Sequence, residues 1–410
     1  MRYVIIGNSA AAVGCIEGIR KHDKTGAITV ISSENYHTYS RPLISYLLYG
    51  KTTEQKMKYR PDSFYEDNKV TLLAGKRAAK IDNEKKQVVL EDGTEIPYDR
   101  LLIATGSDPF VPPIEGIDTV EKKFTFMSLD DAKELDKALS QKSRVLIMGA
   151  GLIGLKCAEG IAGKVKSITV VDMADRILSS ILNSEAASIV QWHIESKGIK
   201  FILSDSVVSF SPGKAVLKSG RSVSFDILVV AVGVRANTRL AIDAGIEVAR
   251  GIVTDDHCRT SVGDIYAAGD CSESIDVVTG ERRVLALLPN AYMQGECAGI
   301  NMAGGDEKYN YAIAMNAIGF FGLHIITAGC YTGSERLVSE KNSYKKLFVD
   351  NGCLAGYILV GDVARAGIYT SLIRERVPLD TIDFELICEK PQLMAFSRTQ
   401  REQMLGGVLR

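Results

Sequence analysis

The residues in this sequence whose types and spacing best suit chemistry are three glycines halfway along the chain, Gly149, Gly151 and Gly154. They follow the apolar run "RVLIM" and precede the helical periodicity of residues 152–163. In this spacing the first glycine permits a tight turn, the second lets the backbone approach a diphosphate, and the third lets a helix pack on a strand. The N–H groups at the helix start attract phosphate. The pattern predicts a dinucleotide-binding loop formed by Gly149, Gly151, Leu152, Ile153 and Gly154.

An acidic residue supports this interpretation and bears on which dinucleotide binds. Asp172 ends the next predicted strand, "SITVVD", 23 residues after Gly149. A carboxylate at this place binds a ribose 2′-hydroxyl and repels a 2′-phosphate, which favours NAD(H) over NADP(H). Arg176 follows four residues later and keeps NADP(H) open as an alternative.

A second, less regular loop lies near the start of the chain, in "YVIIGNSAAAVG". After the strand-like residues 2–7 only Gly7 of the three glycines is kept, and Ser9 and Ala12 stand at the other two places. Both residues are small, so a close backbone approach is hindered only slightly, and the Ser9 hydroxyl can donate to a phosphate. Taken alone, this turn is equally compatible with an ordinary strand–helix connection.

The elements that must position these loops follow an alternating pattern. Strand-like apolar runs alternate with helical periodicity through most of the chain, which is typical of the α/β class with parallel sheets. Residues 108–116 contain three prolines and indicate a linker, after which the strand, glycine loop and helix recur. We predict a discontinuous first domain over residues 1–110 and 243–310, a second domain over 111–242, and a small α+β domain over 311–410.

The composition excludes several classes of partner. The chain has 49 basic and 50 acidic residues, so it has no net positive charge to attract nucleic acid or an anionic membrane. No stretch approaches the roughly 18 consecutive apolar residues of a membrane span. The eight cysteines show neither the spacing of a zinc site nor that of a disulfide framework. We therefore expect no bound metal, and free thiols in a cytoplasmic protein.

Several further motifs recur in a fixed order along the chain. They are "GNSAAA", "YSRPLIS", "LLIATGSDP", "GAGLIGLKCAE", "AVGVRANT", "IYAAGD" and "LLPNAYMQGECAGINMAG". Together they resemble the two-dinucleotide flavoproteins of the pyridine nucleotide oxidoreductase superfamily. Within it the chain is most similar to NADH:rubredoxin and ferredoxin reductases and to the flavoprotein part of nitrite reductase large subunits. The resemblance extends to about residue 385 and implies two Rossmann-like domains of the glutathione reductase type, followed by a small α+β domain.

The resemblance implies that FAD binds at the N-terminal loop and NAD(H) at the second loop. The residues implied for FAD are Gly7, Ser9, Ala10 and Ala11 at the diphosphate, Ser33 and Glu34 at the adenosine ribose, Arg41 and Pro42 along the cofactor, Ala78 by the adenine, Ala104, Thr105 and Gly106 near the diphosphate, Gly269 and Asp270 at the ribityl chain, and Leu288, Pro289 and Asn290 at the pyrimidine end of the flavin. For NAD(H), the resemblance implies the residues of the second loop, Asp172, Lys156 and Gly233.

The chain departs from these relatives where the disulfide reductases of the superfamily carry a redox cysteine. The segment after Arg41, "PLISYLLYG", contains none. Dithiol, peroxide and coenzyme A disulfide chemistry of the usual kind is therefore not expected. Cys15 and Cys157 lie on the helices after the two loops, where we expect small buried thiols to serve only in packing.

A second departure concerns charge beside the flavin. Relatives usually have Glu two residues after the last loop glycine, where this chain has Lys156, and a Lys where this chain has Tyr46. The usual Lys–Glu pair is then absent, and a buried lysine needs an anion or must lose its proton. Two interpretations remain: Lys156 reaches solvent, or it contacts the flavin, the nicotinamide amide or a partner carboxylate.

The reaction that these features imply is hydride transfer between NAD(H) and FAD, followed by transfer of single electrons to or from an iron–sulfur carrier such as ferredoxin or rubredoxin. No protein acid or nucleophile is required, so we name no catalytic residue. Two alternatives stay open: an NADH oxidase that works through flavin alone, and a flavin-bearing subunit docked in a larger redox complex. The sequence does not specify the carrier, the direction of electron flow, or whether the chain forms a homodimer.

Overall fold

The computed structural model describes residues 1–340 and 343–405. The chain divides into two compact units. Unit 1 comprises Met1–Asp175, Gly198–Ile275 and Glu281–Ala312, and unit 2 comprises Arg176–Lys197, Asp276–Gly280 and Ile313–Arg410. The boundaries predicted after residues 110, 242 and 310 are finer than this division and stay a prediction. Residues 406–410 of the predicted C-terminal domain lie outside the described residues.

The first sheet of unit 1 is parallel throughout and has the strand order β18-β7-β1-β2-β3. Its strands are β1 (Arg2–Ile6), β2 (Ala27–Ser32), β3 (Val70–Ala74), β7 (Arg100–Ile103) and β18 (Ile265–Ala267). Four of the five residues of β1 are buried, because helices cover a parallel sheet on both faces. Helix α1 (Ala10–His22) connects β1 to β2 and begins directly after Gly7 and Ser9.

The second sheet of unit 1 has the order β12-β11-β10-β16-β9, again with every pair parallel. Four of its strands repeat the order of the first sheet, but its edge strand β9 precedes β10 in the chain, whereas β18 follows the other strands of the first sheet. Its strands are β9 (Lys123–Phe124), β10 (Arg144–Met148), β11 (Ser167–Val171), β12 (Ile199–Ile202) and β16 (Ile227–Val230). Helix α5 (Leu152–Ile161) connects β10 to β11 as α1 connects β1 to β2. The two glycine loops therefore hold equivalent places in two parallel sheets that share the order of four strands, and the predicted α/β class is confirmed.

Smaller pieces complete unit 1. Two antiparallel sheets consist of β4 (Ala78–Asp82), β5 (Gln87–Leu90) and β6 (Glu95–Pro97), and of β13 (Val207–Ser211), β14 (Lys214–Leu217) and β15 (Ser222–Ser224). Strands β8 (Ser107–Pro109) and β17 (Val234–Ala236) pair antiparallel, as do β19 (Ser274–Ile275) and β20 (Arg282–Arg283). The helices are α2 (Ile44–Leu48), α3 (Phe64–Asp67), α4 (Leu129–Ala138), α7 (Arg239–Asp243) and α8 (Leu288–Met302). The β8–β17 ribbon joins the segments that carry the two large sheets.

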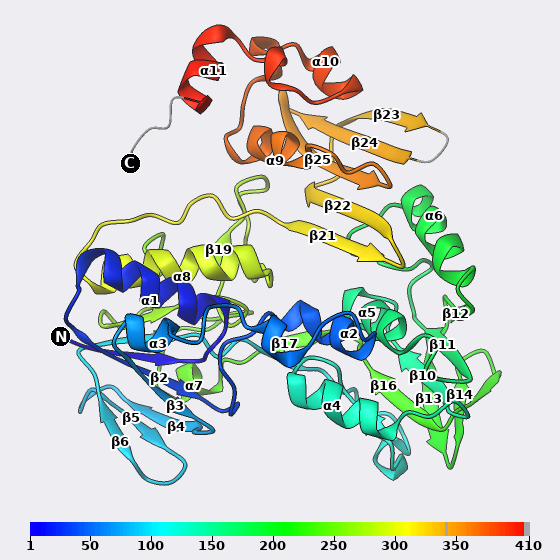
Figure 1. Ribbon diagram of the computed structural model, residues 1–410, viewed down its shortest axis with the longest axis horizontal. Helices are drawn as coiled ribbons and strands as arrows, with labels where there is room; N and C mark the ends of the chain where they lie inside the picture. Colours follow the sequence, from blue (N-terminus) through cyan, green and yellow to red (C-terminus); the bar gives the residue numbers. More distant parts are fainter. Residues whose placement is uncertain (341–342, 406–410) are drawn as a thin grey trace. The chain divides into compact units, whose positions relative to one another are not determined.

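Helices α1 and α8 lie side by side with their backbones in contact (Figure 1). A Cβ atom added to Gly14 would lie 2.2 Å from the carbonyl oxygen of Tyr292, and one added to Gly295 would lie 2.0 Å from that of Ala11. Gly18 and Gly299 make the same approach one turn further on. Only glycine permits this separation. The paired spacing of four residues on each helix therefore fixes α8 against α1, although the two are far apart in sequence.

Unit 2 contains an antiparallel sheet of order β21-β22-β25-β24-β23. Its strands are β21 (Met315–Phe320), β22 (Leu323–Gly329), β23 (Ser334–Glu340), β24 (Ser343–Asp350) and β25 (Cys353–Val360). The helices of this unit are α6 (Ser184–Glu195), α9 (Ala366–Arg374), α10 (Phe384–Glu389) and α11 (Arg398–Leu405). The fully buried strand β25 and the buried side chains of α9 form its core, which confirms the expected α+β texture after residue 311.

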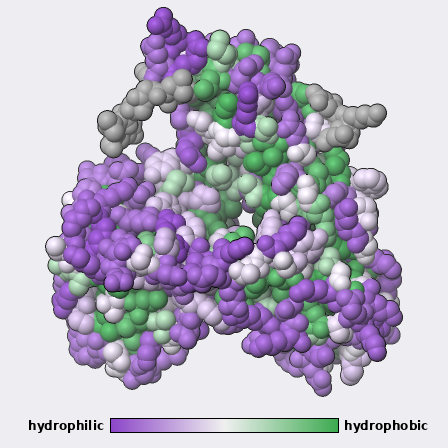
Figure 2. Space-filling model, in the orientation of Figure 1, coloured by the Kyte–Doolittle hydropathy of each residue, from purple (hydrophilic) through white to green (hydrophobic). Residues whose placement is uncertain are grey.

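The surface agrees with the balanced composition. Hydrophilic residues cover most of the face shown in Figure 2. Within residues 1–340 and 343–405, no helix combines the length and the apolar character needed to cross a bilayer.

Candidate dinucleotide-binding sites

A cavity of about 790 Å³ lies in unit 1 at the carboxyl ends of β1, β2, β7 and β18. This is the edge at which open parallel sheets bind nucleotides. The predicted FAD residues that line the cavity are Gly7, Ser9, Ala10, Ala11, Ser33, Glu34, Arg41, Ala78, Ala104, Thr105, Gly106, Gly269, Asp270 and Leu288. Pro42, Pro289 and Asn290 were also predicted to contact FAD, but they do not line it. Asn290 is fully buried, and its Oδ1 accepts a hydrogen bond from the Tyr309 hydroxyl at 3.1 Å.

The N-terminal loop keeps its one glycine for a steric reason. Gly7 has a φ angle of +120°, and a Cβ added to it would lie 2.1 Å from the carbonyl oxygen of Ala104. No other residue fits, because both the backbone conformation and the contact exclude a side chain. Ala12, at the third glycine position, is fully buried inside α1, so a methyl group is accepted there.

The electrostatics of this cavity depend on the backbone. Its lining includes six acidic side chains and four basic ones, so side chains alone do not supply a net positive charge for a diphosphate. The 13-residue helix α1 begins at the cavity, and its N-cap residue Ser9 makes no side-chain capping bond. The first N–H groups of α1 are left without intrahelical partners and carry the positive end of the helix dipole. A diphosphate bound there would satisfy both.

Glu34, Tyr39 and Arg41 form one network on the cavity wall. Arg41 contacts Glu34 Oε1 at 2.6 Å, and the Tyr39 hydroxyl donates to Glu34 Oε2 at 2.8 Å. The Tyr39 oxygen also accepts the N–H of Leu129 at 3.0 Å, at the start of α4. Burial raises the pKa of the Tyr39 hydroxyl, which therefore stays a protonated donor. The network fixes the carboxylate predicted to bind the adenosine ribose.

Asp270 lines the same cavity beside Gly269. Ser107 Oγ donates to Asp270 Oδ2 at 3.2 Å. Burial raises the pKa of the Asp270 carboxyl above its ordinary value, while the Ser107 hydrogen bond and the charge of Arg41 act in the opposite direction. A carboxylate held in this way is a ready acceptor for a hydroxyl of a bound ligand, and among the described residues no basic side chain forms an ion pair with it.

Some lining residues were not predicted from the sequence. They include Asn8, Tyr36, Tyr39, Lys76, Arg77, Glu91, Ser107, Asp108, Thr125, Met127, Ser128, Asp130, Asp131, Asn237, Arg239, Leu240, Ala268 and Ala291. Ser128 and Asp131 form a capping box at the start of α4. The "S-x-x-D" spacing before an apolar run is readable in the sequence, but it predicts a helix start and not its position at the cavity.

The second loop has the geometry that its three glycines predict. Gly149 has a φ angle of +105°, and a Cβ added to it would lie 2.2 Å from the Ala231 carbonyl oxygen. A Cβ added to Gly154 would lie 2.0 Å from the carbonyl oxygen of Gly149, where helix and strand pack. A Cβ added to Gly151 would meet no atom within 4 Å. Gly149 and Gly154 are thus required by the fold, whereas Gly151 leaves space for a ligand.

Asp172 lies beside this second loop. Its carboxylate accepts the N–H of Ala150 at 2.6 Å and the N–H of Ala174 at 2.8 Å. The loop and the acidic residue are thereby held together before any ligand binds. Leu152 and Ile153, partly exposed at the start of α5, and Gly233, with a φ angle of +124° and open space around it, complete the predicted set.

Lys156 has a carboxylate partner that the sequence analysis did not identify. Its Nζ forms an ion pair with Glu159 and lies 4.5 Å from the centroid of the Tyr46 ring. The two side chains of the ion pair are 18% and 10% exposed, so Lys156 does not extend into solvent. Of the two interpretations, the structure thus agrees with the one in which Lys156 contacts a partner carboxylate, and that carboxylate is Glu159, three residues along α5.

The cysteines do not contribute to the wall of the N-terminal cavity. The cavity lining contains none. Cys15 and Cys157 are fully buried, and burial raises the pKa of both thiols, which suppresses the reactive thiolate.

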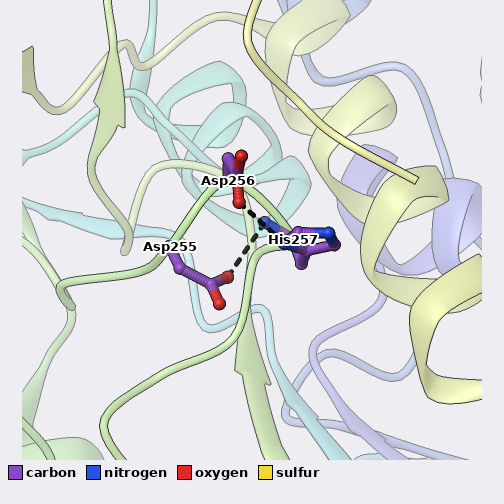
Figure 3. A group of neighbouring side chains, drawn as sticks. All are labelled: Asp255, Asp256 and His257. Atoms are coloured by element: carbon purple, nitrogen blue, oxygen red, sulfur yellow. Dashed lines mark hydrogen bonds and ion pairs between the residues drawn. The ribbon is translucent and has the colours of Figure 1, made fainter. Parts of the chain in front are cut away.

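One cluster of possible metal ligands, Asp255, Asp256 and His257, lies outside both sites (Figure 3). Asp255 accepts the backbone N–H groups of His257 and Arg259, and the His257 ring is paired with Asp256 and Asp306. These contacts account for the cluster as a turn with surface ion pairs, so we assign no metal to it.

The residues present fit two nucleotides. Each loop offers an uncapped helix N-terminus, a glycine held at positive φ, and a carboxylate suited to a hydroxyl group. Gly7 and Gly149 have the same relation to their sheets, and a second strand end contacts each of them through its carbonyl oxygen.

Comparison with known proteins agrees with this geometry. Residues 1–295 match the profile of the pyridine nucleotide-disulphide oxidoreductases, and residues 315–377 match the profile of the rubredoxin NAD+ reductase C-terminal domain. The epsilon subunit of the NADH-dependent phenylglyoxylate dehydrogenase of Aromatoleum evansii is 32% identical, and the alignment covers 92% of each chain.

Two further related proteins differ in how much of their length this chain covers. The assimilatory nitrate reductase electron transfer subunit of Bacillus subtilis is 32% identical over 92% of this chain, which spans only 49% of that relative. Among solved structures, an NAD-dependent persulfide reductase from A. fulgidus is 28% identical and superposes with a TM-score of 0.85, covering 94% of this chain and 79% of that one.

Proposed function

The chain belongs to the family of pyridine nucleotide-disulphide oxidoreductases, with FAD and NAD(H) as its cofactors, and we propose that it transfers electrons between NAD(H) and an iron–sulfur carrier protein. The observation that carries this proposal is the combination of two complete nucleotide loops with a cavity lining that contains no cysteine. Disulfide reduction in this family needs a thiol beside the flavin, and electron transfer to a separate carrier does not. When bound, FAD accepts a hydride from NADH and can release its electrons one at a time.

The protein's part is to bind and to orient. In the N-terminal site, the first N–H groups of α1 and the backbone near Gly7 would hold the FAD diphosphate. Glu34, fixed by Tyr39 and Arg41, would bind the adenosine ribose, and Asp270 would accept a hydrogen bond from the ribityl chain. These groups are half-buried in the structure, and a bound cofactor would shield them further from water, which would strengthen each contact.

In the second site, the space at Gly151 would admit the NAD(H) diphosphate to the start of α5, and Asp172 would bind the ribose 2′-hydroxyl. Arg176, the residue that keeps NADP(H) open, belongs to unit 2 and donates from Nε to the carbonyl oxygen of Leu182 at 3.1 Å. The preference for NAD(H) therefore rests on Asp172.

The identity of the carrier is proposed from the C-terminal match. Residues 315–377 match a domain named for rubredoxin NAD+ reductases, which favours rubredoxin or a small ferredoxin. The test is anaerobic reduction of the FAD-loaded protein by NADH, followed by addition of rubredoxin, ferredoxin or air-saturated buffer in separate stopped-flow runs. Reoxidation by one iron–sulfur protein at least tenfold faster than by oxygen is expected. Fastest reoxidation by oxygen would instead identify an NADH oxidase.

A second candidate function is that of a flavin-bearing subunit within a larger redox complex, with the chain as homodimer or hetero-oligomer. The likeness over 92% of both chains to a subunit of a multisubunit dehydrogenase favours it. Isolation of the protein from its native source at low ionic strength distinguishes the two. Co-purification with an iron–sulfur subunit in fixed ratio supports the complex, and a protein that elutes alone supports the free reductase.

A further inference from the structure

The ion pair of Lys156 lies where the two nucleotide-binding halves of unit 1 meet. Lys156 and Glu159 are on α5, the helix that begins with the NAD(H) loop. Tyr46 is on α2, which follows directly after the short helix Arg41–Leu43 that starts at the FAD cavity. The Lys156 ammonium faces the Tyr46 ring at 4.5 Å, within the range of a cation–π contact.

The backbones of the two helices also meet at this junction. A Cβ added to Gly160 on α5 would lie 2.9 Å from the carbonyl oxygen of Ser45 and 3.2 Å from the Cβ of Leu48. The helices thus pack closely at one point, and the Tyr46–Lys156 contact adds a second point one turn away. A single contact would let the two helices rotate about it, whereas two contacts fix the angle between their axes.

A charged pair at this place calls for an explanation, because burying a lysine and a glutamate stabilises a fold no better than apolar residues of similar size. Its advantage is directional. The ammonium must satisfy the Glu159 carboxylate and the Tyr46 ring face together, which allows only a narrow range of positions for α5 relative to α2. Hydride transfer needs donor and acceptor atoms held about 3–3.5 Å apart, so a small shift between the halves slows it strongly.

We propose that Lys156 is a positioning residue which, through Glu159 and Tyr46, sets the NAD(H) loop in register with the FAD cavity. This inference rests on the proposed function, since it concerns the step between the two nucleotides. Lys156 acts here through the two helices and requires no contact with either nucleotide.

The test uses the FAD-loaded protein and four variants: Lys156→Met, Tyr46→Leu, their combination, and Tyr46→Phe, which keeps the ring. In single-turnover reduction by NADH, both single variants are expected to lower the limiting rate about tenfold. The double variant should fall within about threefold of either single one, because both remove the same contact. Tyr46→Phe should retain the wild-type rate. Lys164→Met is the matched control, since Lys164 pairs with Asp136 outside this junction.

A readout independent of turnover is hydrogen exchange of the FAD-loaded protein without NADH. Lys156→Met and Tyr46→Leu should each speed exchange in both α2 and the start of α5, and FAD content should stay unchanged. The proposal would be overturned if the fold-losses in rate of the two single variants multiplied in the double variant, or if hydrogen exchange stayed at the wild-type rate. A rise in the dissociation constant of NADH in Lys156→Met alone would show direct nicotinamide contact instead. If NADH fails to reduce the flavin of the wild-type protein, the proposed function fails. If NADH reduces the wild-type protein and the variants at the same rate, only this inference fails.

Discussion

The two glycine loops occupy equivalent places in two parallel sheets that share the order of four strands, yet only one loop has three glycines. The difference lies in what each glycine does. In both loops the first glycine is required by a carbonyl oxygen of the neighbouring strand end, 2.1 Å from a Cβ on Gly7 and 2.2 Å from one on Gly149. The second position is open space at Gly151 and holds Ser9 in the first loop. The third position must be glycine at Gly154, whereas the first loop accepts Ala12 there.

The comparison teaches that glycine count does not measure how well a loop binds. In the first site α1 is held by α8 through four glycines at helix–helix contacts, so the fold fixes the helix whose N-terminus faces the diphosphate. In the second site α5 meets the short helix α2 through one glycine, Gly160, and itself approaches strand and loop through Gly154. A cofactor that stays bound and a substrate that exchanges are consistent with these two arrangements.

The largest expected effect comes from adding a methyl group at Gly7. The Gly7→Ala variant should lose about 3 kcal/mol of stability and purify without flavin, because its Cβ collides with a backbone oxygen and its φ angle is positive. Chemical denaturation and the flavin absorbance of the purified protein measure both. A flavin-loaded variant of unchanged stability would show that the loop adapts and that the contact is unimportant.

At Gly151 the same kind of change should separate the two sites. The chain itself leaves room for a side chain there, so Gly151→Val should alter stability by less than about 1 kcal/mol and leave FAD content at the wild-type level. Its affinity for NADH should fall at least about tenfold, because the valine fills the space that a diphosphate needs. Isothermal titration with NAD+ measures the loss. Unchanged affinity would mean that NAD(H) binds elsewhere.

Substitution of Asp172 tests the specificity of the second site. Asp172→Ala should weaken NADH binding about tenfold, because the ribose loses its hydrogen-bond acceptor. It should also reduce the preference for NADH over NADPH, because a 2′-phosphate is no longer repelled by the carboxylate. The ratio of kcat/KM for the two nucleotides reports the change. The matched variant Asp205→Ala removes a nearby carboxylate that bonds Ser219 and Arg221, and should leave the ratio unchanged.

Asp270→Asn should weaken the binding of FAD and stabilise the flavin-free protein. Burial raises the pKa of this carboxyl in the folded state, so the folded form binds its proton more tightly than the unfolded form. The stability that proton binding at Asp270 contributes is fully present below the ordinary pKa of a carboxyl group and is lost as the pH rises through the raised pKa. The gain from Asn should appear at pH 7 and vanish in acid. Thermal unfolding of flavin-free protein at both pH values checks the sign.

The smallest effects are expected where glycines are restored to the first loop. Ser9→Gly should change FAD affinity by no more than about threefold, because backbone N–H groups supply the main contacts. Ala12→Gly should destabilise the protein by about 1 kcal/mol, since Ala12 lies inside α1 and glycine disfavours helix. A gain in FAD affinity from either change would contradict the view that the first loop is complete as it stands.

Local patterns in the sequence were sufficient to predict the parts of each site that one segment supplies. Gly7, Gly149, Gly154 and Asp172 lie next to strand ends, and their places follow from the strand–loop–helix order. The start of α4 reaches the FAD cavity only through the folding of the whole chain, so no spacing rule predicts it. The placement of Asn290 at the flavin stays a prediction; in the structure its side chain accepts a hydrogen bond from the Tyr309 hydroxyl.

The partner of Lys156 is a different case, because a partner carboxylate was among the predicted alternatives and its identity was readable in the sequence. Residues three apart on a helix lie on one face, and Glu159 stands three residues after Lys156. The sequence comparison directed attention to the absent glutamate at position 156 itself. The position of Tyr46 over the ammonium, by contrast, depends on the contact of α2 with α5, which the sequence does not reveal.

The central claim is that one nucleotide stays bound while the other comes and goes. The most direct measurement is an anaerobic NADH titration of the protein after gel filtration has removed loosely bound ligand. We predict that FAD elutes with the protein and that its visible absorbance is bleached by about one equivalent of NADH. Loss of FAD on the column, or a retained flavin that NADH does not bleach, would contradict the account.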